Sequence, residues 1–137
     1  MKILGLDIGE KRIGIAISDK DEKLSAPLDI INNDSNFEAN IGKIINEHNI
    51  KKIVIGMPYT LKGDIGTQAR RVIRFVEDNI DFENVDIDYF DERFTSSIPE
   101  YNMKKNDLKK KDIDKLSAAI ILQDYLDKNN EIKKDQQ

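Results

Sequence analysis

The stretch ILGLDIGEKRIGIAIS, residues 3–18, decides the fold because it reads as two strands joined by a short charged turn. Ile3 to Ile8 is an apolar run typical of a buried strand, and Ile13 to Ser18 returns as a second strand. Their short separation predicts an antiparallel hairpin. One acidic residue, Asp7, stands inside the first strand, where a buried carboxylate is costly unless something positive meets it.

Hydrophobic patterning predicts the remaining elements. In chain order we expect a strand at Leu24–Ile31, a helix from Phe37 to about His48, a strand at Lys52–Met57, a helix from Thr67 to about Asp78, a strand at Val85–Phe90 and a helix at Ile113–Leu126. Each later strand is reached through a helix, and right-handed crossovers place it parallel to the first. The predicted fold class is therefore α/β, with a five-stranded mixed sheet of three antiparallel strands and then two parallel ones, flanked by helices.

Capping signals predict where the helices start. Ser35 and Glu38 have the spacing of a capping box, and so do Ser97 and Glu100. Thr67 is expected to cap the helix that follows it.

Length and composition bound the function classes. The chain of 137 residues suits one compact domain, which we expect at 1–127, with 128–137 as a polar tail that frays. Without cysteine there is neither a disulfide framework nor a thiolate metal site. No window approaches the length of a membrane span, and the first residues lack the features of a signal peptide. We expect a soluble, cytoplasmic protein that has no contact with membranes.

The charge balance leaves room for nucleic acid as a partner. The net charge is −4, from 22 basic and 26 acidic side chains, so the protein is not basic all over. A local patch is enough to hold phosphates, and residues 104–115 contain six lysines against three aspartates. Such a run is also typical of a solvated loop, so its role stays open at this point.

Asp7 has two interpretations. Strand alternation puts Gly5, Asp7 and Gly9 on one face, and the missing glycine side chains would leave that face open to an ion or a phosphate. Alternatively, Asp7 pairs with an internal lysine or caps the hairpin turn.

Two further carboxylates are expected at the same edge of the sheet. Glu92 directly follows the fifth strand, and ligands gather at the carboxyl ends of parallel strands in such sheets. Asp114 shares a helix face with Ala118, Ile121 and Tyr125, which would bring it inward. The alternatives are a surface pair of Glu92 with an arginine, worth under ~1 kcal/mol, and a favourable helix-dipole contact for Asp114.

Three carboxylates at one edge predict a site for divalent cations. Their mutual repulsion is relieved by cations, and Mg²⁺ or Mn²⁺ accept oxygen ligands. Two such ions ~3.5–4 Å apart promote in-line displacement at a phosphodiester, one activating water and the other stabilising the leaving oxygen.

The sequence resembles the YqgF/RuvX family, small bacterial proteins with an RNase H-like fold related to RuvC-type Holliday junction resolvases. The resemblance rests on four motifs in order, GLDIGEKRIGIAISD, IVIGMPYTLKGDIGTQA, DERFTS and KKKDIDKLSAAIILQDYLD, and covers Lys2 to about Asp127. The segment between Glu92 and Asp114 is shorter than is usual in the family, and Pro99 falls where a helix-forming residue is common. The helix after DER is therefore expected to be brief.

The resemblance implies catalytic, metal-binding roles for Asp7, Glu92 and Asp114. Members are described as nucleases that process the 5′ end of pre-16S rRNA in ribosome biogenesis, and resolvase activity on branched DNA has also been proposed for them. Both reactions are metal-assisted hydrolysis of a phosphodiester, expected to leave a 5′-phosphate and a 3′-hydroxyl.

Several basic residues are candidates for holding the nucleic acid. They are Lys11, Arg12, Arg70, Arg93, Lys109, Lys110 and Lys111. Lys11, Arg12 and Arg93 can instead balance the negative charge of Asp7 and Glu92. Structured RNA and branched DNA both stay open as substrates, as do a monomer and a weak homodimer.

Two other function classes remain alternatives. One is a non-catalytic RNA-binding module of ribosome assembly that keeps the fold. The other is an actin-like or Hsp70-like ATP-binding protein, which needs two duplicated lobes, whereas this chain has the length of one and no internal repeat.

Overall fold

The computed structural model describes residues 1–59, 62, 64–91 and 110–135, of which 110–115, 134 and 135 are described in their backbone only. The elements are β1 (Ile3–Ile8), β2 (Arg12–Ser18), β3 (Ser25–Asn32), α1 (Phe37–His48), β4 (Lys52–Met57), α2 (Thr67–Asn79), β5 (Asp86–Asp91) and α4 (Lys110–Asp135).

The five strands form one sheet in the order β3-β2-β1-β4-β5. β1 pairs antiparallel with β2, which pairs antiparallel with β3, while β4 is parallel to both β1 and β5. The predicted mixed sheet is confirmed. The apolar runs of β1, β2 and β4 become the three inner strands of the sheet, and each of them is mostly buried.

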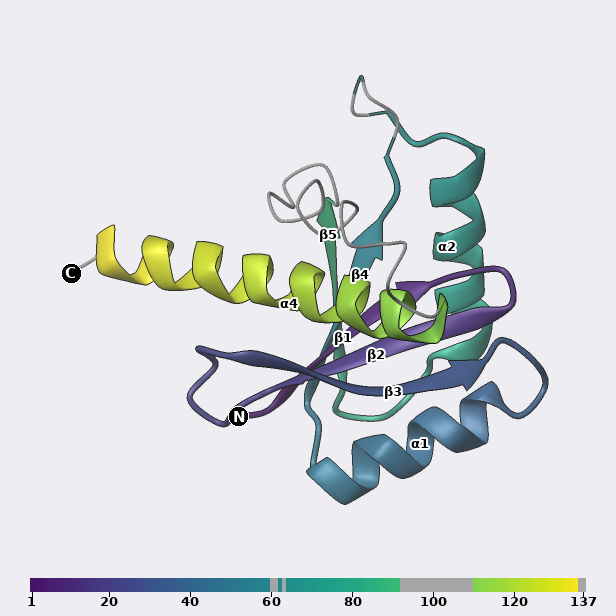
Figure 1. Cartoon of the computed structure of the whole chain (residues 1–137), viewed down its shortest axis with the longest axis horizontal. Coiled ribbons are helices and arrows are strands. Elements are labelled where there is room, and N and C mark those ends of the chain that lie inside the picture. The colour runs from purple at the N-terminus through teal and green to yellow at the C-terminus, as the bar shows by residue number, and fades with distance from the viewer. Residues whose placement is uncertain (60–61, 63, 92–109, 136–137) are drawn as a thin grey trace.

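Helices cover both faces of this sheet (Figure 1). α1 and α2 pack on one face through Phe37, Ile41, Val72 and Val76, against side chains such as Leu6 of β1. On the opposite face α4 buries an apolar stripe that contains Ala118, Ile121, Leu122 and Tyr125. The sheet is thus the middle layer of three.

Gly5 sets how closely α4 approaches β1. A Cβ atom placed on Gly5 would lie 2.8 Å from Cβ of Leu122 and 3.3 Å from the carbonyl oxygen of Ala118. Our expectation that Gly5 leaves the face open for an ion or a phosphate is therefore wrong at this position. The missing side chain instead admits the backbone of the helix.

The direction of α4 follows from polar contacts at its later turns. Oγ of Ser25 donates to the carbonyl of Ala119 at 2.8 Å, and Oε1 of Gln123 accepts from the Ser25 N–H at 2.9 Å. Nδ2 of Asn130 donates to the carbonyl of Glu22, in the turn between β2 and β3, at 3.2 Å. That turn lies at the amino end of β1, so α4 begins toward the carboxyl end of β1 (Figure 1).

Two helix caps and one helix end differ from the prediction, whereas α1 and α2 begin at the predicted Phe37 and Thr67. The N-cap of α1 is Asn36 rather than Ser35. Oδ1 of Asp34 accepts from the Asn36 N–H at 2.9 Å, so Asp34 forms the turn that precedes the helix. The N-cap of α2 is Gly66, and Thr67 is its first helical residue. α4 continues past the predicted end at Leu126 to Asp135. The Ser97–Glu100 capping box lies outside the described residues.

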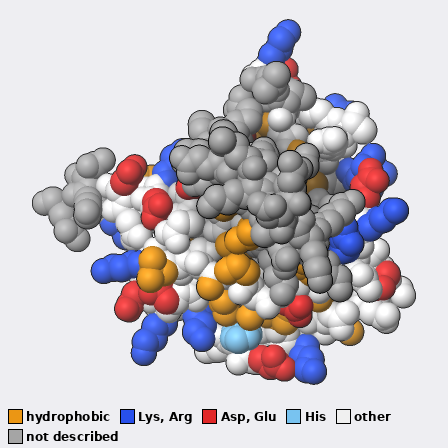
Figure 2. Space-filling model, in the orientation of Figure 1, with side chains coloured by type: hydrophobic (Ala, Val, Ile, Leu, Met, Phe, Trp, Pro, Cys, Tyr) orange, Lys and Arg blue, Asp and Glu red, His pale blue; other side chains and the backbone are white. Residues whose placement is uncertain are grey.

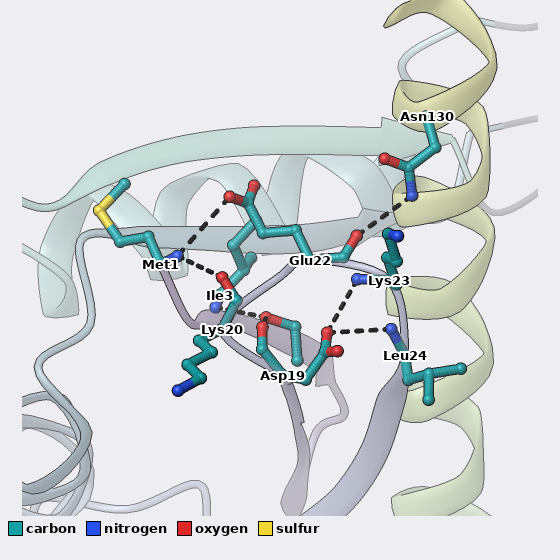
Figure 3. Close-up of polar contacts among 9 residues, drawn as sticks. Met1, Ile3, Asp19, Lys20, Glu22, Lys23, Leu24 and Asn130 are labelled. Atoms are coloured by element: carbon teal, nitrogen blue, oxygen red, sulfur yellow. Dashed lines mark hydrogen bonds and ion pairs between the residues drawn. The ribbon is translucent and has the colours of Figure 1, made fainter. Parts of the chain in front are cut away.

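The turn between β2 and β3 is organised by Asp19 (Figure 3). Its Oδ1 accepts the N–H groups of Lys23 at 2.8 Å and of Leu24 at 3.1 Å. The terminal ammonium of Met1 donates to the carbonyl of Lys20 at 2.6 Å in the same turn. The backbone N–H groups of Leu24 and Lys23 lower the pKa of Asp19 from its ordinary value.

Replacing Gly5 with alanine should destabilise the fold. The added methyl collides with Leu122 in a packed interface, and overpacking of this kind costs about 1–3 kcal/mol. Urea unfolding of Gly5→Ala measures the loss. Gly42→Ala is the matched comparison, because its Cβ meets only the ring edge of Phe82, at 3.2 Å, and the substitution improves helix propensity by about 1 kcal/mol. A Gly5→Ala protein as stable as wild type would contradict this packing.

The Asp19 turn should make stability depend on pH in the acid range. A lowered folded pKa means that the carboxylate stabilises the protein above its unfolded pKa, and that this contribution disappears as pH falls through the folded value. The difference in unfolding free energy between wild type and Asp19→Ala should therefore shrink between pH 6 and strongly acid pH. Urea titrations across that range measure it, and a constant difference would contradict the assignment.

Candidate functional site

Asp7 lies at the carboxyl end of the central strand. Its Cα is opposite Gly14 in β2, and on the other side β4 continues from Ile55, the partner of Leu6, to Gly56. Asp7 is half-buried, and Gly14 and Gly56, on the two neighbouring strands, are buried. The carboxylate thus emerges between two residues that have no side chains, on the sheet face that α4 covers.

The first turns of α4 lie toward this same end of β1. Asp114 is one helical turn before Ala118, whose carbonyl approaches Gly5 two residues before Asp7. The predicted apolar face of this helix is confirmed for its described members, since Ala118, Ile121 and Tyr125 are all buried. The backbone at position 114 is helical; its side chain lies outside the described atoms, and Glu92 lies outside the described residues.

The predicted basic residues fall into two groups. Lys11 is exposed in the turn between β1 and β2, Arg12 is half-buried at the start of β2, and Arg70 is exposed on α2. Arg93 and Lys109 lie outside the described residues, and Lys110 and Lys111 begin α4 with only their backbone described.

A pocket of about 480 Å³ opens at the carboxyl ends of β1 and β4. It is lined by Asp7, Ile8, Gly9, Glu10, Asn33, Pro58, Gln68, Arg71, Val72 and Phe75. Most of its wall comes from the β1–β2 turn and the first half of α2. The strand end therefore meets α4 on one face of the sheet and this pocket on the other.

Polar contacts hold the β1–β2 turn beside the pocket. Nδ2 of Asn33 donates to the carbonyl of Gly9 at 2.9 Å, and the Asn33 N–H donates to the carbonyl of Lys11 at 2.9 Å. Glu10 forms an ion pair with Arg71 of α2. Both members are exposed, so the pair adds little stability; it brings the Arg71 guanidinium next to the β1–β2 turn.

A second, cationic hollow lies beside the first. It measures about 340 Å³ and is lined by Thr67, Arg70, Arg71 and Arg74. The three guanidinium groups project from the first turns of α2, where free backbone N–H groups also favour anions. Arg71 lines both hollows, so the two are continuous at that residue.

Charge elsewhere on the described surface is mixed. On the face in Figure 2, basic and acidic side chains alternate around the periphery. Among the side chains that the structure describes, no three His, Cys, Asp or Glu residues cluster closely enough to hold a metal ion. No helix in the described part of the chain is long and apolar enough to cross a membrane.

Tyr125 has a raised pKa, and its contacts are structural. Burial raises the pKa of Tyr125, and so does the hydrogen bond that its hydroxyl donates to Oδ2 of Asp88 at 2.8 Å. The Tyr125 ring also stacks edge-on against Phe90, with centroids 5.8 Å apart. These contacts tie α4 to β5.

Sequence reasoning missed most of the pocket. Asn33 directly follows β3, Gln68 and Phe75 come from α2, and none of the three belongs to a recognisable local motif. The available signal was topological, because Asn33 follows β3 and Gln68 opens the helix after β4, at the edge where ligands are expected.

Comparisons with known proteins agree on one family. A family model described as "RuvX: Holliday junction resolvase" matches residues 1–128. A protein of Sulfurihydrogenibium sp. named "Putative pre-16S rRNA nuclease" is 49% identical over 93% of this chain and 90% of its own length. A protein of Chloroflexus aggregans with the same name is 40% identical over 91% of this chain and 92% of its own length.

A solved structure shares the fold. T. thermophilus RuvC in complex with Holliday junction substrate superposes with a TM-score of 0.60, covering 93% of this chain and 96% of that one. At 10% identity this likeness speaks for the RNase H-like fold alone.

Proposed function

We propose that this chain, which belongs to the RuvX family, is a metal-dependent nuclease that hydrolyses phosphodiester bonds in precursor 16S rRNA, near its 5′ end. The observation that carries the proposal is the position of Asp7. A half-buried carboxylate ends the central strand between two glycines, with the start of α4 on one side and an arginine-rich hollow nearby. This hydrolysis would take place in the cytoplasm.

The proposed ligands suit a hard divalent cation. Asp7, Glu92 and Asp114 offer only carboxylate oxygens, which Mg²⁺ and Mn²⁺ prefer. Bound there, a pair of such ions would supply Lewis-acid chemistry at the phosphodiester. The protein's own part is to fix the oxygen ligands on rigid elements: Asp7 pairs with Gly14 of β2, and the preceding Leu6 pairs with Ile55 of β4.

Basic side chains are proposed to hold the phosphates around the cleaved bond. Arg70, Lys11 and Arg12 are placed by α2 and the β1–β2 turn, at the same edge as Asp7. Arg93 and Lys109 to Lys111 are proposed for the same role from the sequence alone.

The relatives' names favour RNA, and they leave a second candidate. The family model is described as a Holliday junction resolvase, and the RuvC structure contains a junction substrate, so cleavage of branched DNA is the alternative. A resolvase needs two sites facing a symmetric junction, whereas an RNA-processing nuclease works as a monomer or a weak homodimer. Incubating the protein with precursor rRNA and with a four-way junction, and measuring its mass in solution, separates the two.

Asp7→Asn should abolish cleavage and preserve binding. Losing one metal ligand removes several kcal/mol of transition-state stabilisation, equivalent to about a hundredfold or more in rate. Cleavage of labelled precursor rRNA with Mn²⁺ measures the loss, and gel-shift titration measures binding. Asp19→Asn, in the turn at the opposite end of β1, is the control and should cleave normally.

A chelator should stop the wild-type reaction in the same assay. Wild-type protein inert on RNA and on branched DNA with either metal would instead support a non-catalytic RNA-binding module. Full activity of Asp7→Asn would contradict the proposed ligand set.

The arginines of α2 should set the salt dependence of binding. Each phosphate contact releases counterions, so removing one should reduce the slope of log K against log salt by about 1. We expect a reduction of about 2 for the pair Arg70→Ala and Arg74→Ala, measured by fluorescence anisotropy across a salt series. Lys43→Ala, an exposed cation on α1, should leave the slope unchanged.

A further inference from the structure

The pocket next to Asp7 has the wrong charge for a phosphate. Its ionisable lining residues are Asp7, Glu10 and Arg71, and Glu10 already pairs with Arg71. The lining thus carries no net positive charge, whereas the adjoining hollow of Arg70, Arg71 and Arg74 is formally positive. A polyanionic substrate would place its phosphates in the second hollow and an uncharged group in the first.

The walls of the pocket suit a flat aromatic ring with polar edges. Ile8, Pro58, Val72 and Phe75 give it apolar surfaces. Gln68 and Asn33 add side-chain amides, which can donate to and accept from the edge of a base. Its volume of about 480 Å³ lies within the range of roughly 300–1,000 Å³ that is usual for small-molecule sites.

The position of the pocket relates it to the reacting bond. Asp7 is part of its lining, and Arg71 joins it to the cationic hollow. A nucleotide seated here would have its ring in the pocket, its phosphate at the arginines and its neighbouring bond toward the Asp7 carboxylate. Proteins that recognise single-stranded RNA often bind bases that are splayed out of the stack in this way.

We propose that this pocket binds one unstacked nucleobase of the substrate, at a nucleotide adjacent to the cleaved phosphodiester. The inference rests on the proposed nuclease function and assigns a recognition site to it. The chemistry is common to single-stranded RNA and to the unpaired nucleotides of branched DNA. The base site would position the strand, so that hydrolysis occurs where a base can leave its stack.

The test compares a nucleotide with its base-free counterpart. AMP, UMP and ribose 5-phosphate are titrated into the isotope-labelled protein in EDTA, and NMR shifts of Ile8, Val72 and Phe75 report on the pocket. Base stacking should make the two nucleotides about five- to a hundredfold tighter than ribose 5-phosphate. Only the nucleotides should shift the pocket signals, while all three ligands reach the arginines.

Two variants on α2 separate the base from the phosphate. Gln68→Leu keeps the size of the side chain but removes the amide, so it should weaken AMP about two- to tenfold without changing ribose 5-phosphate. Arg70→Ala should weaken both ligands equally and leave their ratio unchanged. Both residues are exposed, so neither change is expected to disturb folding.

Three results would overturn the base pocket. They are equal affinities of AMP and ribose 5-phosphate, shifts confined to the arginines, and ATP binding more than tenfold tighter than AMP, which would indicate a triphosphate site. None of these bears on cleavage, because the titration contains no metal. Conversely, wild-type protein inert on RNA and on branched DNA with either metal would remove the nuclease proposal and leave the titration result standing.

Discussion

The contact between Gly5 and α4 is the constraint on which the rest of the arrangement depends. A helix cannot approach a strand this closely over any larger residue, since even a methyl at Gly5 would lie 2.8 Å from Leu122. The hydrogen bonds of Ser25 to Ala119 and Gln123 then fix the direction of the helix across the sheet. As a result, the start of α4, far from β1 in sequence, lies toward the strand end that presents Asp7.

The end of β1 also explains why the proposed cleavage site and the proposed base pocket can lie next to each other. Alternation along the strand sends Asp7 to the α4 face and Ile8 to the α2 face, where Ile8 joins the wall of the pocket. The two faces of the sheet are connected around the end of the strand, because the described strands of the sheet are packed and leave no passage between the two faces. In our proposal the ions and the scissile bond occupy one side, and an unstacked base occupies the other.

The sequence allowed the sheet to be predicted more fully than the site. β1 and β4 have the predicted bounds because a continuous apolar run buried on both faces has few other solutions. The predicted capping of α1 by Ser35 was wrong because Asp34 competes with Ser35 for the same turn, and local spacing does not decide between them. Gly5 was misjudged since a glycine beside an aspartate fits both an open site and a close helix contact.

The parts of the site that escaped prediction are tertiary. Asn33, Gln68 and Phe75 become neighbours only when β3, β4 and α2 are in place, so no local pattern announces them. Asp7 was identified because a charged residue inside a buried strand is anomalous on its own. The roles of Glu92 and Asp114 still rest on the family resemblance, since their side chains lie outside the described atoms.

An acidic protein can still bind a polyanion if its charges are separated along the sheet. The acids of the β2–β3 turn, Asp19, Asp21 and Glu22, lie at the amino end of β1, whereas Arg70, Arg71 and Arg74 lie near its carboxyl end. A strand of six residues spans about 20 Å, and at physiological salt the screening length is about 8 Å. The charge of these turn acids is therefore largely screened at the arginines. What a phosphate meets there is the local guanidinium cluster together with the amino end of α2, which is why binding should depend on these few side chains more than on overall charge.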